Sequence, residues 1–250
     1  MQIPWAQYAG FLGAGLAMGF GAVGSGMGLG LAATGAIRSM ERQPAASPIM
    51  FRNMLVTQAV TETPAIFALV IALNIFFQAR GNLETQHSLA QAAVYLAAGL
   101  CAGIGAMGTG LGSGQVGRLA LRAIGTAPRR QSQLLMYMLI GQAFTETGAI
   151  FALVIAALML NFSGLAALGT PETIHLAGQC LGAAFSMGFG AVGAALGIAY
   201  VAGKAIQAIG RAPEAQDPIR NAFFIGTATT ESTVIFSLVI SLLLLTQNLG

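Results

Sequence analysis

Three glutamates, Glu62, Glu146 and Glu231, are the residues whose type and spacing point most directly to chemistry. They lie at nearly equal intervals along the chain, in the similar apolar segments TETPAIFALVIAL, TETGAIFALVIAA and TESTVIFSLVISL. An ionised carboxylate at the centre of a bilayer costs at least about 2.5–3.5 kcal/mol, so an acid in such a segment indicates a function. Because apolar surroundings favour the neutral form, the carboxyl can hold a proton and release it when a cation comes near. The pattern therefore predicts reversible ion binding.

A protonated glutamate could instead serve only as a hydrogen-bonding link between helices. One such residue would leave that alternative open, but three at the same place in similar segments favour ion binding. Polar neighbours are candidate supporting ligands, namely Thr63, Thr147, Ser232, Gln58 and Gln142. A hydroxyl in a membrane helix often bonds only the carbonyl oxygen one turn back, so both interpretations of these neighbours stay open.

The rest of the sequence offers little other chemistry. The remaining acids are expected to be solvated charges in loops or at helix ends: Glu41, Glu84, Glu172, Glu214 and Asp217. The two cysteines and two histidines are isolated, which predicts neither a disulfide nor a metal site. The glycine-rich segments lack the Gly-Lys-Ser/Thr ending of a phosphate-binding loop. We therefore expect no cofactor, no nucleic-acid partner and no catalysis by the chain alone.

The composition places the glutamates in a membrane protein. Hydrophobic residues make up 56% of the 250 residues and charged residues 8%, against about 25% charged residues in soluble domains. Several apolar stretches exceed the roughly 20 residues needed to cross a bilayer. We expect an all-α membrane protein with six transmembrane helices, the first of which belongs to the mature protein. The predicted helices cover residues 6–40, 49–78, 90–124, 132–161, 174–209 and 218–246.

The chain consists of three copies of one unit. The glycine-rich segments GSGMGLGLA, GTGLGSGQV and GAALGIAYV recur at the same intervals as the glutamates. A short polar turn that contains a proline separates the two parts of each copy, which predicts a helical hairpin. The three predicted hairpins comprise residues 1–82, 83–168 and 169–250.

Glycines in the first helix of the first two copies recur at every second position, which leaves two flanks of the helix free of side chains. In the third copy Ala195 and Ala199 dilute this pattern. Small residues allow membrane helices to approach each other closely. Each glycine-rich helix is therefore predicted to pack against a neighbour on either side, as a closed ring of helices requires. The glycines assigned to this packing are Gly24, Gly26, Gly28, Gly30, Gly108, Gly110, Gly112, Gly114, Gly193 and Gly197.

The basic residues predict the orientation of the chain. All lysines and arginines except Arg80 flank the proline turns. Because basic loops stay on the cytoplasmic side, the turns are expected to face the cytoplasm and both termini to lie outside. The expected location is a bacterial inner membrane.

These features resemble the c-subunit, the proteolipid of F-type ATP synthases, as three fused copies. The most specific parts are the GSGMGLG helix, the Arg42-Gln43-Pro44 loop and the glutamate within TETPAIFALV. The resemblance implies a rotor ring with glycine-rich helices inside and glutamate-bearing helices outside. It also implies ion exchange against an arginine of the stator a-subunit, and contact of the loops with the γ and ε subunits of the central stalk. The stalk-contact loop residues are then Arg42, Gln43, Pro44, Pro128, Arg211 and Pro213.

The same resemblance favours H⁺ over Na⁺ as the transported ion. Sodium-binding relatives carry a glutamine on the glycine-rich helix, where this chain has Leu29, Ser113 and Ile198. They also carry a tyrosine five residues after the glutamate, where this chain has phenylalanine. A bare Na⁺ needs several oxygen ligands, whereas a proton needs only one carboxylate in a dry setting. The hydroxyl beside each glutamate is counter-evidence, and Na⁺ stays an alternative.

Two other assignments stay open. Fused hairpins are more frequent among V-type and A-type proteolipids, but doubled forms often lose one carboxylate, and all three are present here. The second alternative is a secondary transporter or channel with a substrate site at a repeat interface. Such repeats are usually inverted, whereas the three units of this chain run in parallel.

Overall fold

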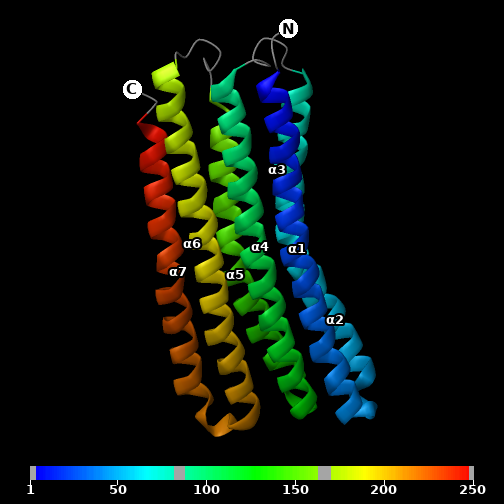
Figure 1. Cartoon of the computed structure of the whole chain (residues 1–250). Helices are drawn as coiled ribbons and strands as arrows, with labels where there is room; N and C mark the ends of the chain where they lie inside the picture. Colours follow the sequence, from blue (N-terminus) through cyan, green and yellow to red (C-terminus); the bar gives the residue numbers. More distant parts are fainter. Residues whose placement is uncertain (1–3, 82–87, 163–169, 248–250) are drawn as a thin grey trace.

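Six helical spans within the described residues are long and apolar enough to cross a membrane, which confirms the predicted all-α fold (Figure 1). The computed structural model describes residues 4–81, 88–162 and 170–247. The glycine-rich helices of the three hairpins are α1 (Trp5–Arg42), α4 (Leu89–Thr126) and α6 (Thr170–Arg211). The glutamate-bearing helices are α2 (Ser47–Thr61) with α3 (Thr63–Gly81), α5 (Gln131–Leu160) and α7 (Gln216–Thr246).

The loop prolines determine where each glycine-rich helix ends. The proline ring disfavours the helical conformation for the residue that precedes it. Gln43, Ala127 and Ala212 accordingly share one non-helical conformation, with φ between −138° and −127° and ψ between 64° and 79°. The proline then begins a short 3-10 helix that leads into the second helix, where its missing N–H group would have had no partner. These helices are η1 (Pro44–Ala46), η2 (Pro128–Arg130) and η4 (Pro213–Ala215).

The second span is interrupted at Glu62, whereas the sequence pattern predicts one helix over residues 49–78. Pro64 explains the interruption, because it cannot donate a backbone hydrogen bond to the preceding turn and its ring crowds that turn. The Ala65 amide instead donates to the Glu62 carbonyl oxygen, three residues back, over 3.0 Å. The corresponding residues of the other copies are Gly148 and Thr233, and α5 and α7 continue through them.

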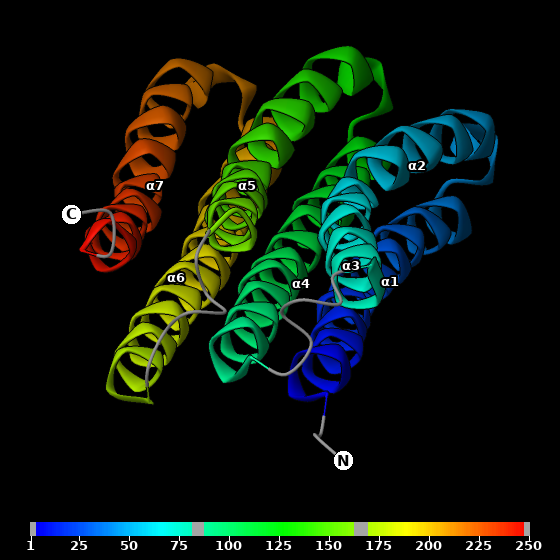
Figure 2. The same ribbon diagram turned by 90° about the horizontal axis from the view of Figure 1, so that it is seen from above.

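The helices form two layers (Figure 2). One layer contains α1, α4 and α6, and α4 lies between its two neighbours and contacts both. The other layer contains α2 with α3, α5 and α7, which we call the outer layer because its helices contact one another little. Each outer helix packs on its own glycine-rich helix, and α3 and α5 also contact the glycine-rich helix of the following hairpin. An outer helix thus lies over the groove between two inner helices.

Glycines set the close approach within the inner layer. A Cβ atom at Gly110 of α4 would lie 2.7 Å from the Ser25 amide nitrogen of α1. On the opposite flank of α4, a Cβ atom at Gly112 would lie 2.6 Å from the Ala195 carbonyl oxygen of α6. Any side chain at these two positions would force the inner helices apart.

The loops and the chain ends lie at opposite ends of the hairpins. The three proline turns are at the bottom of Figure 1, and the N- and C-termini are at the top. The long helices have 38 residues in α1 and α4, about 57 Å at 1.5 Å per residue. This length exceeds a hydrocarbon core of about 30 Å, so the helix ends reach beyond it on both sides.

Candidate functional site

The three glutamates lie at one level in the hairpins. Glu62, Glu146 and Glu231 each follow the loop proline of their copy by eighteen residues, or about 27 Å along a helix. Glu62 lies between α2 and α3, Glu146 lies within α5, and Glu231 lies within α7. The outer layer therefore carries one carboxylate per hairpin at a common depth, close to the middle of the helices.

Glu146 has the most enclosed carboxylate of the three. Its helix α5 packs on both α4 and α6 and is flanked by α3 and α7. Glu146 is only 8% exposed, and neither of its carboxylate oxygens has a hydrogen-bond partner among the described residues. A carboxylate removed from water without a partner is costly in its charged form. The geometry therefore favours a bound proton or cation at this site.

Glu62 and Glu231 are less enclosed, since Glu62 is exposed and Glu231 is half-buried. They belong to the first and last hairpins, which have a neighbouring hairpin on only one side within a single chain. Among the described residues α7 packs on one inner helix, α6, whereas α5 packs on both α4 and α6. The difference in exposure thus follows the position of each hairpin in the chain.

A polar cluster joins the first two hairpins one turn away from Glu146. The buried Gln142 places its Nε2 atom 3.1 Å from Ser113 Oγ, 3.2 Å from Thr61 Oγ1 and 3.2 Å from the Thr57 carbonyl oxygen. The hydroxyls of Thr61 and Ser113 are 3.3 Å apart. The Oε1 atom of Gln142 is buried and has no partner among the described residues.

The other candidate supporting residues bond elsewhere. The hydroxyls of Thr147 and Ser232 donate to carbonyl oxygens of their own helices, at 3.0 and 2.7 Å. Gln58 donates to the Leu29 carbonyl oxygen of α1 over 3.3 Å. Thr63 makes no side-chain hydrogen bond within the described part of the chain. These contacts place the hydroxyls beside the glutamates without directing them at the carboxylates.

The residues assigned to the stalk-contact loop all lie at the end of the structure that carries the proline turns (Figure 1). Arg42 and Arg211 are the last residues of α1 and α6, and Gln43 follows Arg42. Pro44, Pro128 and Pro213 begin the three short 3-10 helices. The three loops therefore all face the same side of the molecule.

Comparison with known proteins gives the family. The family of ATP synthase c-subunits matches residues 12–75, 96–159 and 181–244. The chain belongs to this family. Each match contains one of the three glutamates, and the resemblance to three fused copies of the c-subunit is thereby confirmed.

Individual c-subunits correspond to one hairpin each. The second ATP synthase c-subunit of Cereibacter sphaeroides is 46% identical over 79 residues, which is 32% of this chain and 94% of the relative. The ATP synthase c-subunit of Thermotoga maritima is 42% identical over 77 residues, or 31% of this chain and 91% of the relative. The ATP synthase c-subunit of Chloroflexus aurantiacus is 47% identical over 64 residues, or 26% of this chain and 84% of the relative. This chain is therefore similar in length to three such proteins.

The three c-subunit units of this chain differ from one another around the glutamate. Ser113 has Leu29 and Ile198 as its counterparts in the other two units. Only the middle unit therefore has a hydroxyl on the inner helix at this level. The repeat interval reveals the substitution in the sequence, but it does not show that Gln142 of the same unit and Thr61 of the preceding unit meet this hydroxyl.

Proposed function

We propose that several copies of this chain close into the ion-carrying rotor ring of an ATP synthase. The proposal rests on glycines of the inner helices. Positions that are uncovered on α1 are equivalent to positions on α4 that are covered by a neighbouring inner helix. Around the Cβ positions of Gly15, Gly19, Gly26 and Gly30 of α1 the described residues leave open space, with no neighbouring helix within 4 Å. Their counterparts one repeat later are the α4 glycines that pack against α1, namely Gly99, Gly103, Gly110 and Gly114.

Helix α6 of the third hairpin offers the complementary surface. On α4, Gly108 and Gly112 pack against α6. Their counterparts on α6 are Gly193 and Gly197, of which Gly193 has no neighbour within 4 Å. In our proposal α6 of one copy packs against α1 of the next, as α4 packs against α6 within the chain. A head-to-tail contact of this kind, repeated from copy to copy, forms a ring when the rotation between neighbouring copies brings the last copy back to the first.

In this ring each glutamate binds and releases one ion. The new contact would enclose Glu231 between two inner helices, as Glu146 is enclosed within one chain. We propose H⁺ as the ion, because Leu29 and Ile198 supply no oxygen ligand at the level where Ser113 stands. The proposed partners are an arginine-bearing stator a-subunit and the γ and ε subunits of the stalk. The proline turns then face the cytoplasm of a bacterial cell and both termini lie outside.

Dicyclohexylcarbodiimide, which attacks protonated carboxyls in apolar surroundings, is expected to label Glu62, Glu146 and Glu231. The acids Glu41 and Glu214 are expected to escape, because they are exposed rather than enclosed in apolar surroundings. Peptide mass spectrometry of the treated protein measures the label on each residue. Labelling found mainly on the exposed acids would contradict the assignment of the ion sites.

The same reaction distinguishes H⁺ from Na⁺. Labelling is followed at fixed pH while NaCl is raised, with KCl as the control salt. We expect no sodium-specific protection, together with labelling that decreases as the pH rises. Sodium-specific protection of all three glutamates would instead show that Na⁺ is the ion.

The fusion predicts the number of hairpins in the ring. Because each chain contributes three hairpins, a ring made only of this chain contains a multiple of three. Particle images or native mass spectrometry of the detergent-extracted assembly give the count. A number not divisible by three, with no other proteolipid present, would refute a ring built from this chain alone.

A further inference from the structure

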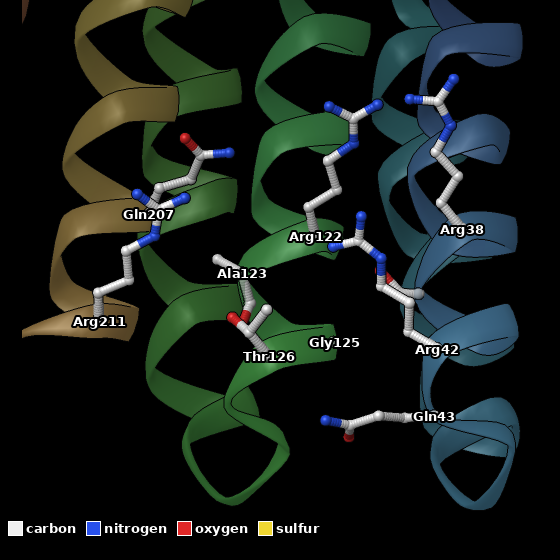
Figure 3. A pocket seen from close by; sticks show the side chains of 10 residues that line it. Arg38, Arg42, Gln43, Arg122, Ala123, Gly125, Thr126, Gln207 and Arg211 are labelled. Atoms are coloured by element: carbon white, nitrogen blue, oxygen red, sulfur yellow. The ribbon is translucent and has the colours of Figure 1, made fainter.

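Four arginines from all three inner helices surround one pocket near the proline turns (Figure 3). Arg38 and Arg42 come from α1, Arg122 from α4 and Arg211 from α6. The pocket has a volume of about 300 Å³ and is also lined by polar residues, Gln43, Thr126 and Gln207 among them. In Figure 3, Arg38, Arg42 and Arg122 extend toward one another from adjacent helices.

The positive charge of this pocket is not neutralised by the described part of the chain. None of the four arginines forms an ion pair or a hydrogen bond within it. The nearest acids in the sequence, Glu41 and Glu214, are exposed and form no ion pair with them. The C-terminal ends of three inner helices add a partial charge of about −0.5 each. Four guanidinium charges exceed that sum, so the pocket is strongly positive.

The orientation of the chain in the membrane does not require that four arginines line one pocket. Basic residues at the turns are sufficient to hold a loop in the cytoplasm. Arg52, Arg129 and Arg220 also lie near the turns, are exposed and do not line the pocket. The gathering of arginines around one cavity therefore needs a further explanation.

The depth of the pocket matches the phosphate layer of a bilayer. Arg38 and Arg122 each precede their loop proline by six residues, or about 9 Å of helix. The glutamate level lies about 27 Å from the prolines, so these arginines are about 18 Å from that level. If the glutamates mark the membrane centre, the hydrocarbon core ends at about 15 Å and the headgroup layer at about 20–22 Å.

We propose that this pocket binds a phosphate group, supplied by the headgroup of an anionic lipid on the side of the inner helices that faces away from the outer layer. Arginine is suited to this ligand because its planar guanidinium donates two parallel hydrogen bonds to phosphate oxygens. Basic pockets between membrane helices bind anionic headgroups for the same reason. Free phosphate has the same chemistry and is separated from lipid by the experiment below.

Differences between the copies limit the number of phosphate groups that one chain binds in this pocket. The counterpart of Arg38 and Arg122 on α6 is Gln207, and the counterpart of Arg42 and Arg211 on α4 is Thr126. Within one chain, three of the four arginines therefore lie on the α1–α4 side of the pocket, and Arg211 alone lies on the α6 side. We expect about one phosphate group per chain in this pocket, because the Gln207 side of the pocket has fewer charges to offer.

The test uses the full chain in the oligomeric form in which detergent extracts it. Native mass spectrometry measures retention of phosphatidylglycerol after incubation with vesicles of phosphatidylcholine and phosphatidylglycerol. Calorimetric titration with inorganic phosphate forms the second arm. We expect selective retention of phosphatidylglycerol. If inorganic phosphate binds as tightly as phosphatidylglycerol, the pocket is a phosphate site whose ligand is a soluble anion rather than a lipid. Binding of neither probe would overturn the proposal.

A double variant, Arg38→Gln with Arg122→Gln, tests whether the pocket itself binds. We expect affinity for phosphatidylglycerol to fall by at least about tenfold, since two charge-assisted hydrogen-bonding groups are lost. The matched control is Arg129→Gln with Arg130→Gln, which removes the same charge at the same end outside the pocket. This control is expected to stay within about twofold, because neither Arg129 nor Arg130 lines the pocket. Equal losses in both variants would contradict the pocket.

Two measurements keep a negative result interpretable. Oligomer size and carbodiimide labelling of Glu146 report whether the double variant assembles, and they test the proposed ion site independently of lipid. If the glutamine pair does not assemble, Arg38→Lys with Arg122→Lys is measured instead. This pair keeps both charges but loses the paired hydrogen bonds, and we expect severalfold weaker retention. Unchanged lipid retention with loss of stalk binding would overturn the proposal and assign the arginines to a protein partner.

Discussion

Replacing Glu146 with glutamine is expected to reduce ATP-driven proton uptake to the level of vesicles that lack the protein. Glutamine has nearly the same shape as a protonated glutamate, but it cannot release a proton. In a rotor every site must pass the stator in turn, so one blocked site in each chain stops all of them. Proton uptake by inverted membrane vesicles, followed with a pH-sensitive dye, measures the effect.

The matched control is Glu172→Gln. Glu172 is an exposed acid in the first turn of α6, which begins at the end of the structure opposite to the proline turns. This variant is expected to retain full uptake. The Glu146 variant also discriminates between the rotor and a transporter with an independent site in each repeat, which would lose only about one third of its activity. Residual uptake near two thirds would therefore argue against the ring.

Replacing Gly26 with valine is expected to prevent assembly of the oligomer while leaving the single chain intact. No neighbouring helix in the described part of the chain comes within 4 Å of a Cβ position at Gly26, whereas its counterpart Gly110 packs on the α1 backbone. In the proposed ring α6 of the preceding copy covers Gly26. Overpacking of this kind costs about 1–3 kcal/mol at each interface, and the cost is repeated at every chain-to-chain contact.

Native electrophoresis of detergent extracts separates assembled from single chains. Gly178→Val is the control, since Gly178 also has open space around it and the substitution is the same. Its counterpart Ala93 on α4 stays partly exposed although α4 has an inner helix on either side. Gly178 is therefore expected to face away from the interface. Equal behaviour of the two variants would contradict the proposed packing.

Most of the fold could be predicted because its determinants are local and repeated. The apolar spans, the proline turns and the nearly constant repeat interval are visible in the sequence. Repetition also explains why the three glutamates lie at one level. The interruption at Glu62 had a local signal as well, in Pro64, but the sequence alone does not show whether a membrane helix bends or breaks at a proline.

The remaining features depend on how hairpins are placed beside one another. The hydrogen bonds among Thr61, Ser113 and Gln142 join two hairpins, and no spacing within one hairpin predicts them. The basic pocket likewise requires α1, α4 and α6 to lie side by side, with Arg38 and Arg122 at the same height. The repeat interval shows equivalent positions, but only the packing of the helices shows which of them meet.

The polar cluster around Gln142 has a consequence for how the proposed rotor would turn. In a ring of identical single hairpins every ion site presents the same energy to the stator, so all steps of rotation are alike. Here one site in three has Ser113 on the inner helix, while the other two have Leu29 and Ile198. A ring of such chains has an energy profile that repeats every three ion sites. The rotor would therefore pause for different times at successive sites, in a pattern that recurs every third step.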